Sequence, residues 1–187
     1  MNAEMLTKWP DVPACYEWLA LDRRGQWRLR GERVTHGGLI AFLNHHYEAD
    51  ADGCWRVLNG PQRVYVDLAL TPWVYRREGE DFVTHTGLPA GPVAAVYLTA
   101  AGEVLLAADP GIGLLDDRDL PALLAACRNA SGGEPPAEVW EQLLATAETA
   151  AGLEAGSGIF WGDLPLQLLP ATCDLGVHFG FCARPRP

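Results

Sequence analysis

The chain has 187 residues, of which 49% are hydrophobic and 20% charged, and its formal net charge at pH 7 is −10. This composition is typical of a globular protein that buries a core of its own, and it excludes a disordered or fibrous chain. The acidic surplus argues against nucleic acid as a partner, because binding to a phosphate backbone depends on clustered Lys and Arg.

Membrane and metal-binding classes are also disfavoured. The longest apolar runs are far shorter than the ~20 residues of a membrane helix, and Glu4, Lys8 and Asp11 interrupt any signal-peptide pattern. The five cysteines form no Cys-x-x-Cys pair, which predicts free thiols and neither a disulfide framework nor a zinc site. We therefore expect a cytoplasmic protein with no membrane partner, no metal and no other cofactor.

The first half of the chain predicts a hairpin followed by a helix. Its expected elements are an irregular lead-in over residues 1–15 that packs Trp9, strands over 17–21 and 26–30, a helix from an N-cap at Thr35 to about Glu48, and a strand over 54–58. The helix is expected because Leu39, Phe42 and Leu43 share one face at 100° per residue.

Residues 60–77 contain the longest strand pattern of the chain. Val64, Val66 and Leu68 alternate with polar or aromatic residues, which is the period of a half-buried strand. Pro72 has no N–H to donate to a ladder, so the strand should bend, end or reach a sheet edge there. We expect one long, kinked strand.

The second half predicts another hairpin and two helices. Its expected elements are strands over 82–86, 93–99 and 103–107, a helix started by Pro121 with Asp117 or Asp119 as N-cap, a helix over 137–151 closed by Gly152, and short strands over 159–161, 165–169 and 176–181. The Pro- and Gly-rich residues 88–92 are the expected boundary between an N-terminal half, residues 1–90, and a C-terminal half, residues 91–187. A single compact unit is the alternative.

An internal repeat relates the two halves. A shift of 77 residues places the segment from Leu21 to Leu29 on the segment from Leu98 to Leu106, with the turn glycines Gly25 and Gly102 in register. A shift of 81 aligns the following helices, with Leu39, Phe42 and Leu43 on Leu120, Leu123 and Leu124, and His46 on Cys127. The pattern predicts two related hairpin-plus-helix (ββα) halves, with the frequent order of hairpin then helix as the alternative explanation.

Several short motifs carry a resemblance. They are Leu21-Asp22-x-x-Gly25-x-Trp27, Asp52-Gly53-x-Trp55, Asn59-Gly60-Pro61, Thr71-Pro72-Trp73-Val74 and His178-Phe179-Gly180-Phe181. Over nearly its whole length the chain resembles an uncharacterised proteobacterial family catalogued only as a domain of unknown function. The order of its DG motifs, helix and long strand is also similar to that of a second such family, for which signalling has been suggested. Neither resemblance implies catalytic or binding residues.

Motifs that would support catalysis or metal binding are incomplete. Asp50 and Asp52 imitate the start of a calcium loop, but Asn59 stands where that loop needs a bidentate Glu. The adjacent His45 and His46 point about 100° apart on a helix, unlike metal-binding pairs. The glycines at 111 and 113 lack the third glycine of a dinucleotide loop. A Cys-His pair such as Cys54 with His85 stays open, because only a structure can place the two side chains together.

The outward face of the central strand supplies the candidate binding site. Aromatic and Arg side chains are typical of binding surfaces, and the expected site residues are Gln62, Arg63, Trp73 and Arg76, with Tyr65, Asp67, Tyr75 and Arg77 on the same outward set. The alternative is that Trp73 and Tyr65 belong to the core and that the arginines pair with acidic residues.

Together these patterns predict an α+β protein of antiparallel sheets with about three helices. We expect a binding or regulatory module, not an enzyme, whose partner is a protein or a small anionic ligand. A small enzyme or small-molecule-binding protein, with its site at the junction of the halves, is the alternative. The sequence predicts no oligomeric state.

Overall fold

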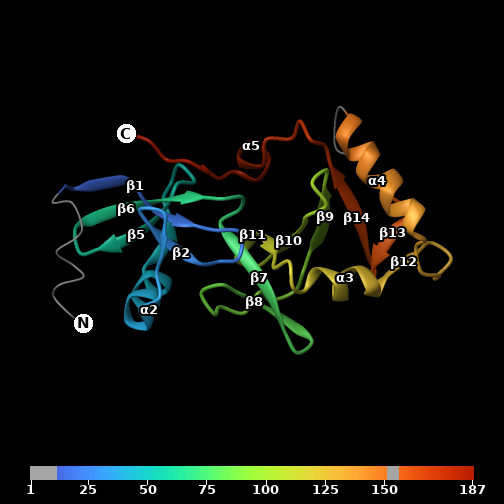
Figure 1. Ribbon diagram of the computed structural model, residues 1–187, viewed down its shortest axis with the longest axis horizontal. Coiled ribbons are helices and arrows are strands. Elements are labelled where there is room, and N and C mark those ends of the chain that lie inside the picture. Colours follow the sequence, from blue (N-terminus) through green and yellow to red (C-terminus); the bar gives the residue numbers. More distant parts are fainter. Residues whose placement is uncertain (1–11, 151–155) are drawn as a thin grey trace. The chain divides into compact units, whose positions relative to one another are not determined.

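The computed structural model describes residues 12–150 and 156–187, which fold into two compact units (Figure 1). The first unit takes its described residues from the ranges 1–72, 85–87 and 175–187. The second unit takes them from 73–84 and 88–174. Each unit contains one sheet and is described by itself. Whether residues 88–92 divide independently folding domains stays a prediction.

The first unit contains a six-stranded sheet in the order β3-β2-β1-β6-β5-β4. Its elements are β1 (Ala14–Leu21), β2 (Trp27–Leu29), β3 (Glu32–Arg33), α2 (Gly37–His45), β4 (Tyr47–Ala49), β5 (Trp55–Asn59), β6 (Gln62–Leu68) and, near the C-terminus, α5 (Leu175–Phe179). Strands β1 and β6 are parallel and the other neighbours are antiparallel. The alternating apolar residues Val64, Val66 and Leu68 are buried, as a strand with one covered face requires.

The helix α2 starts one residue later than expected. His36, not Thr35, is the N-cap, and its Nδ1 accepts a hydrogen bond of 3.2 Å from the N–H of Leu39. The helix ends at His45 because Tyr47 already pairs with Val57 in the sheet. Leu43 is the buried residue of the helix and attaches it to the core.

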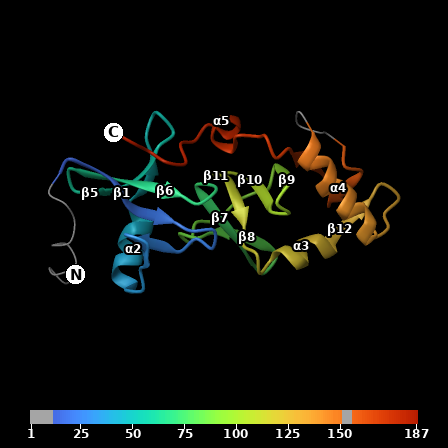
Figure 2. The same ribbon diagram turned by 45° about the horizontal axis from the view of Figure 1, so that its top comes forward.

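The second unit contains an eight-stranded sheet in the order β12-β13-β14-β9-β10-β11-β7-β8. Its elements are β7 (Trp73–Glu78), β8 (Asp81–Thr84), β9 (Ala95–Thr99), β10 (Val104–Ala108), β11 (Gly111–Leu115), α3 (Leu120–Ala126), β12 (Cys127–Asn129), α4 (Ala137–Thr149), β13 (Ile159–Trp161) and β14 (Leu164–Leu169). Figure 2 shows α3 leading directly into β12.

The two sheets share an order of strands. Read from β11 to β12, the second sheet repeats the order and the parallel or antiparallel sense of the first, with β7 and β8 added beside β11. The registers also coincide: Leu21 pairs with Trp27 in the first unit, and Leu98 pairs with Val104 in the second. Both turns bring a glycine to positive φ, at Gly25 and Gly102, where an L side chain would be strained.

The helices correspond at a shift of 80 residues instead of the expected 81. Leu43 and Leu123 are the buried residues of α2 and α3, and the strands after the helices begin with the buried Tyr47 and Cys127. This alignment of the two helices matches the buried positions, whereas the shift of 81 matched leucines by residue type. Cys127 therefore corresponds to Tyr47, and not to His46.

The fold class is confirmed in its coarse form, a mixed α+β protein made mostly of strands. The expectation of about three helices and purely antiparallel sheets was wrong. The described residues form four helices, and the pairs β1–β6, β7–β11 and β9–β14 are parallel. Most of the segment at 176–181, expected as a strand, instead belongs to α5.

The long central strand was also predicted incorrectly, because it is two strands in different sheets. Strand β6 ends at Leu68, the ladder is interrupted before the N–H-lacking Pro72, and β7 begins at Trp73. The hydroxyl of Tyr47 donates a 2.8 Å hydrogen bond to the carbonyl of Pro72, which fixes this break in the first unit. The expected contacts of Trp9 and the cap at Gly152 lie outside the described residues.

Candidate functional site

A pocket of about 220 Å³ lies in the second unit. Its walls come from the β7–β8 hairpin, from α3 and from β13, and include Arg77, Glu80, Phe82, Asp119, Leu123 and Trp161. Strands β8 and β13 lie near opposite ends of the sheet order, yet the rings of Phe82 and Trp161 meet edge to face with centroids 5.9 Å apart. The sheet therefore curls, and α3 lies against the pocket between its ends.

The hairpin geometry places Arg77 and Phe82 on the same face. The two residues are directly paired across β7 and β8, and cross-strand partners project to one side of a sheet. Gly79 makes the intervening turn with φ of 66°, a value that favours glycine. Phe82 is buried and forms the apolar floor, while Arg77 stands at the exposed rim.

Two connections attach α3 to strand β7. The N–H of Arg77 donates to Oδ2 of Asp119 at 2.8 Å, so the N-cap residue of α3 binds the neighbouring strand and not its own helix. The N–H of Asp116 donates to the carbonyl of Tyr75 at 2.7 Å. Because both lie at the start of α3, they hold this wall of the pocket in position.

The carboxylate of Asp116 is buried beside an exposed arginine. Hydrogen bonds from Arg118, at 2.8 Å from Nε to Oδ1, lower the pKa of Asp116 to about 2 against the opposing effect of burial. The acid stays ionised at neutral pH, and Arg118, which is paired with it, is not among the residues that line the pocket. The rim keeps Arg77, Glu80 and Asp119 as its charged groups.

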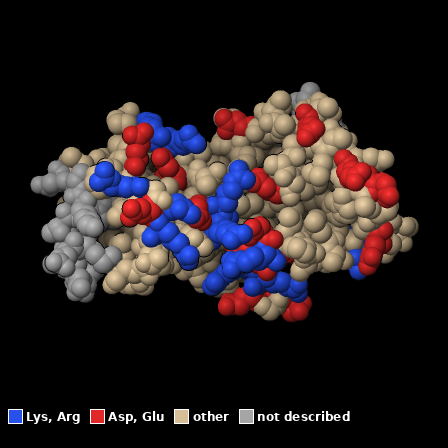
Figure 3. All heavy atoms as spheres, in the orientation of Figure 1, with Lys and Arg blue, Asp and Glu red and all other residues tan. Residues whose placement is uncertain are grey.

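The rim of the pocket is acidic on balance. Nε of Arg77 donates to the carbonyl of Gly79 at 2.8 Å, and its Nη2 lies 3.7 Å from Glu80. The second unit contains four Arg and fifteen Asp or Glu residues, whereas the first contains ten Lys or Arg and nine Asp or Glu residues. Figure 3 shows acidic side chains dominating over α4 on the visible face. The negative charge of the protein is therefore a property of the second unit.

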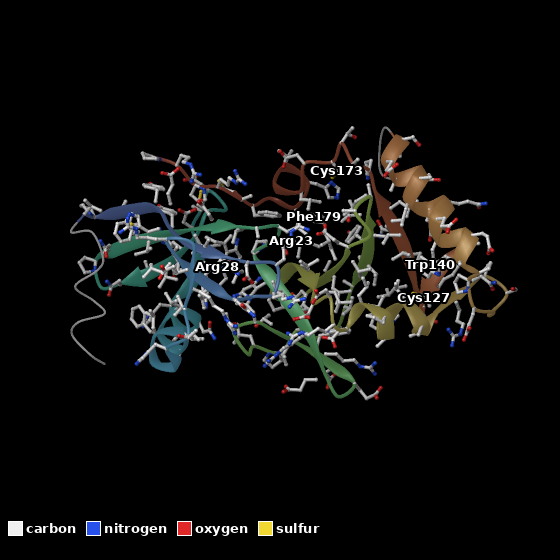
Figure 4. All side chains as sticks on the ribbon, in the orientation of Figure 1. Arg23, Arg28, Cys127, Trp140, Cys173 and Phe179 are labelled. Carbon is white, nitrogen blue, oxygen red and sulfur yellow. The ribbon has the colours of Figure 1, made fainter. Side chains whose placement is uncertain are left out.

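The corresponding residues of the first unit are buried. Val57 pairs with Tyr47 there, whereas Trp161 pairs with Cys127 in the second unit, where Cys127 marks the end of α3 (Figure 4). The ring of His85 then packs against Tyr47, with centroids 5.6 Å apart. Burial of the imidazole lowers the pKa of His85 to about 3, so the ring is neutral at pH 7.

The residues predicted as a site are divided between the units. Gln62 and Arg63 lie on β6 in the first unit, and Trp73 and Arg76 lie on β7 in the second. Arg63 and Arg76 are exposed and have no ion pair among the described residues, and Gln62 donates a 2.7 Å bond to the carbonyl of Val12. Their joint role in binding stays a prediction.

The aromatic members of that outward set belong to the core. Trp73 is 5% exposed and its indole N–H donates to the carbonyl of Pro110 at 2.8 Å. Tyr65 is 9% exposed and stacks on Tyr16 with ring centroids 4.6 Å apart. The core alternative therefore holds for Trp73 and Tyr65.

The other motifs have structural roles. Asp50 Oδ1 accepts hydrogen bonds from the N–H groups of Asp52 and Cys54, as in an ordinary Asp-Gly turn. In the described part of the chain, no three His, Cys, Asp or Glu side chains gather as metal ligands would. The helices of the same residues include none long and apolar enough to cross a membrane.

Comparison with known proteins identifies the family. The family model described as "Protein of unknown function (DUF2946)" matches residues 1–186. The chain belongs to this family. No curated protein matches the sequence.

Two solved structures are similar in part. A DUF1285 family protein from Silicibacter pomeroyi DSS-3 is 14% identical, with a TM-score of 0.47 over 67% of this chain and 77% of that chain. A DUF1285 family protein from Shewanella baltica OS155 is 15% identical, with a TM-score of 0.42 over 55% and 86%. Both are described as members of a further family of proteins named only by number, and likenesses of this degree carry no functional assignment.

Proposed function

We propose that the protein is a non-catalytic binding module of the cytoplasm whose second unit holds a small aromatic molecule with a cationic group. The observation that carries this proposal is the 220 Å³ pocket with its paired Phe82 and Trp161 rings. A cavity of ~150 Å³ suffices for one benzene ring, so the pocket suits a ring with a short substituent. Edge-to-face contacts with two aromatic walls would orient such a ring.

The charge of the ligand follows from the rim. Glu80 and Asp119 outnumber Arg77 there, and the guanidinium of Arg77 is already bonded to the carbonyl of Gly79. The field of a unit with eleven more acidic than basic residues attracts cations and repels anions. A protonated amine could therefore approach the carboxylates while its ring contacts Phe82 and Trp161.

Calorimetry with three matched probes tests the proposal. Benzylamine should bind with a roughly millimolar Kd and benzyl alcohol more weakly, whereas an excess of benzoate should leave the binding of benzylamine unchanged because the pocket does not take up benzoate. Asp119→Asn, which keeps an acceptor for the N–H of Arg77, should weaken benzylamine several-fold, and Trp161→Leu should abolish measurable binding. Trp55→Leu, in the first unit, is the control and should leave binding unchanged. Equal binding of all three probes, or none, contradicts the proposal.

A second candidate is the outer face of the first unit, as a surface for a small anionic ligand or an acidic protein. Arg63 is exposed there without an acidic partner among the described residues, close to the stacked Tyr16 and Tyr65. If this surface binds, benzoate should interact with the wild-type chain and lose affinity on Arg63→Ala but not on Arg33→Ala, an exposed arginine of β3. Unchanged benzoate binding in Arg63→Ala would remove this candidate.

We further propose that the two units arose by duplication of one three-strand, helix, three-strand element. The support is the shared strand order together with matching registers: Leu19 pairs with Val66 and Val96 pairs with Leu166, in parallel ladders. Residues 17–43 and 94–124 should superpose as hairpin plus helix with the same handedness in an experimental structure. Helices that cross their sheets in different directions would contradict a common origin.

A further inference from the structure

The C-terminal segment, residues 180–187, is part of the first unit and contacts the residues before β5 and at the end of β6. Cys182 and Cys54 form a parallel bridge, in which the N–H of Cys182 donates to the carbonyl of Gly53 at 2.9 Å. One residue further, the carbonyl of Ala183 accepts a 2.8 Å bond from the N–H of Leu68. A Cβ atom on Gly53 would lie 2.6 Å from the carbonyl oxygen of Gly180, so the two backbones are in direct contact.

This contact brings two thiols together. Cys182 is close enough to Cys54 to contribute to its raised pKa, and bridged residues of neighbouring strands are about 4.8 Å apart. That spacing lies within the Cα separation of roughly 4.4–6.8 Å that a disulfide accepts. Both side chains are half-buried, which leaves an approach for a small reagent.

The remaining thiols differ in position. Cys15 and Cys127 are buried. Cys173, labelled in Figure 4, lies between β14 and α5 in the second unit. Among the described residues, none of these three cysteines is paired with another cysteine in a β-bridge. Cys54 and Cys182 are therefore the pair whose thiols are brought together.

We propose that Cys54 and Cys182 are a modification site that takes up a reversible disulfide bond by exchange with a small disulfide such as oxidised glutathione. The bond would fasten the C-terminal segment to the residue that precedes β5. It would also close the chain between residues 54 and 182 into a loop containing the whole second unit.

The exchange balances in two steps. The Cys182 thiolate attacks one sulfur of oxidised glutathione, forms a mixed disulfide and releases the first glutathione thiolate. The Cys54 thiolate then attacks Cys182 Sγ, forms the protein disulfide and releases the second glutathione. Two protein thiols are oxidised, the glutathione disulfide is reduced to two thiols, and the two cysteine protons end on them.

The order of attack follows from the surroundings of the two thiols. Burial, contact with Cys182 and the charges of Asp50 and Asp52 raise the pKa of Cys54 to about 12. Cys182 is therefore the entering thiol. Once it is bound to glutathione it no longer competes as an anion, and its closeness to Cys54 favours ring closure over a second intermolecular reaction.

The test uses the full chain equilibrated with oxidised and reduced glutathione at neutral pH. Oxidation should reduce the intact mass by two hydrogen atoms, and proteolytic mapping should recover a peptide pair joined through Cys54 and Cys182. The oxidised chain should migrate faster on a non-reducing gel and melt roughly 5 °C or more above the reduced chain, because the bond restricts the unfolded state.

Serine variants separate this pair from other thiols. Cys182→Ser should prevent the mass loss and the change in migration, whereas Cys173→Ser should leave both unchanged. Three outcomes overturn the proposal: a bond between Cys173 and Cys182, a stable glutathione adduct at Cys182, or full alkylation of Cys54 and Cys182 under conditions that oxidise a surface dithiol peptide. Cys54→Ser repeats the test from the other partner and should likewise prevent the mass loss.

Discussion

The two sheets have one frame but distribute their large side chains in opposite ways. In the first strand after α2, the large Tyr47 pairs with the small Val57 of β5. In the first strand after α3, the small Cys127 pairs with the large Trp161 of β13. In the first unit the tyrosine and His85 fill the space, while in the second the indole is half-buried and lines a pocket. One exchange of volumes therefore separates the buried core of the first unit from the β13 wall of the pocket in the second.

The sheet edges differ as well. Strand β3 of the first unit has two residues, both exposed, whereas its counterpart β11 is buried and extended by β7 and β8. The added hairpin brings Arg77 and Phe82 to α3. The pocket is thus a consequence of what is attached to the shared frame, and the frame itself supplies only α3 and β13.

The largest effect is expected from reversing the volumes in the first unit. Val57 has no exposed surface, so Val57→Trp should lower the free energy of unfolding by about 3 kcal/mol or more through overpacking. Adding Tyr47→Cys should recover part of this loss, although the hydrogen bond to Pro72 disappears. Urea unfolding of the single and double variants measures the coupling, and strict additivity would contradict the exchange of volumes.

A second comparison uses the two edge positions that correspond in register. A Cβ atom on Gly113 would lie 2.5 Å from the ring of Tyr75, so Gly113→Ala should cost about 1–3 kcal/mol. The matching residue of the first unit is Glu32, which pairs with Leu29 as Gly113 pairs with Leu106. Glu32→Ala should change stability by less than ~0.5 kcal/mol. Equal costs at both positions would contradict the account of the added hairpin.

The buried imidazole of the first unit gives a third, pH-dependent effect. His85 has a folded-state pKa of about 3, below its ordinary value, so only the unfolded chain gains its proton between pH 6.5 and 3. Stability should fall as the pH drops below about 6.5, by at most ~1.4 kcal/mol per pH unit. Denaturation at pH 7 and pH 5 measures this loss, and His85→Gln should reduce it. An undiminished loss in the variant would mean that other groups cause it.

The smallest effect concerns Asp116 at the start of α3. Its pKa is lowered to about 2, so its stabilising contribution is complete above about pH 4 and is lost as the pH falls toward 2. Arg118 is largely exposed, so solvent screening keeps the cost of Arg118→Ala at pH 7 small. The variant should also show a shallower loss of stability below pH 4 than the wild type, whereas an identical acid profile would exclude this pairing as its cause.

The hairpins could be predicted from sequence because their information is local. Gly25 and Gly102 stand between alternating strands, and a glycine turn admits few registers. Strand β11 was missed because Gly111 and Gly113 favour a loop, and only the tyrosine ring packed on Gly113 explains the second glycine. The break between β6 and β7 followed from Pro72, but the proline could not indicate that β7 joins another sheet.

The pocket was only partly accessible to such reasoning. The turn at Gly79 suffices to place Arg77 and Phe82 on one face, and alternation separates the two faces of a strand. Alternation does not indicate which face of a strand packs against the rest of the protein. For that reason the residues expected to point outward included the buried Tyr65 and Trp73. Trp161 depends on the curl of an eight-stranded sheet, which no local pattern encodes.

The most direct test of the pocket is nuclear magnetic resonance of the chain labelled with ¹⁵N at tryptophan, titrated with benzylamine. The indole signal of Trp161, assigned by its disappearance in Trp161→Leu, should move progressively, while the signal of Trp27 in the closed core of the first unit should stay in place. Movement of Trp27 with an unchanged Trp161 would contradict the assignment of the open pocket to the second unit and of the filled core to the first.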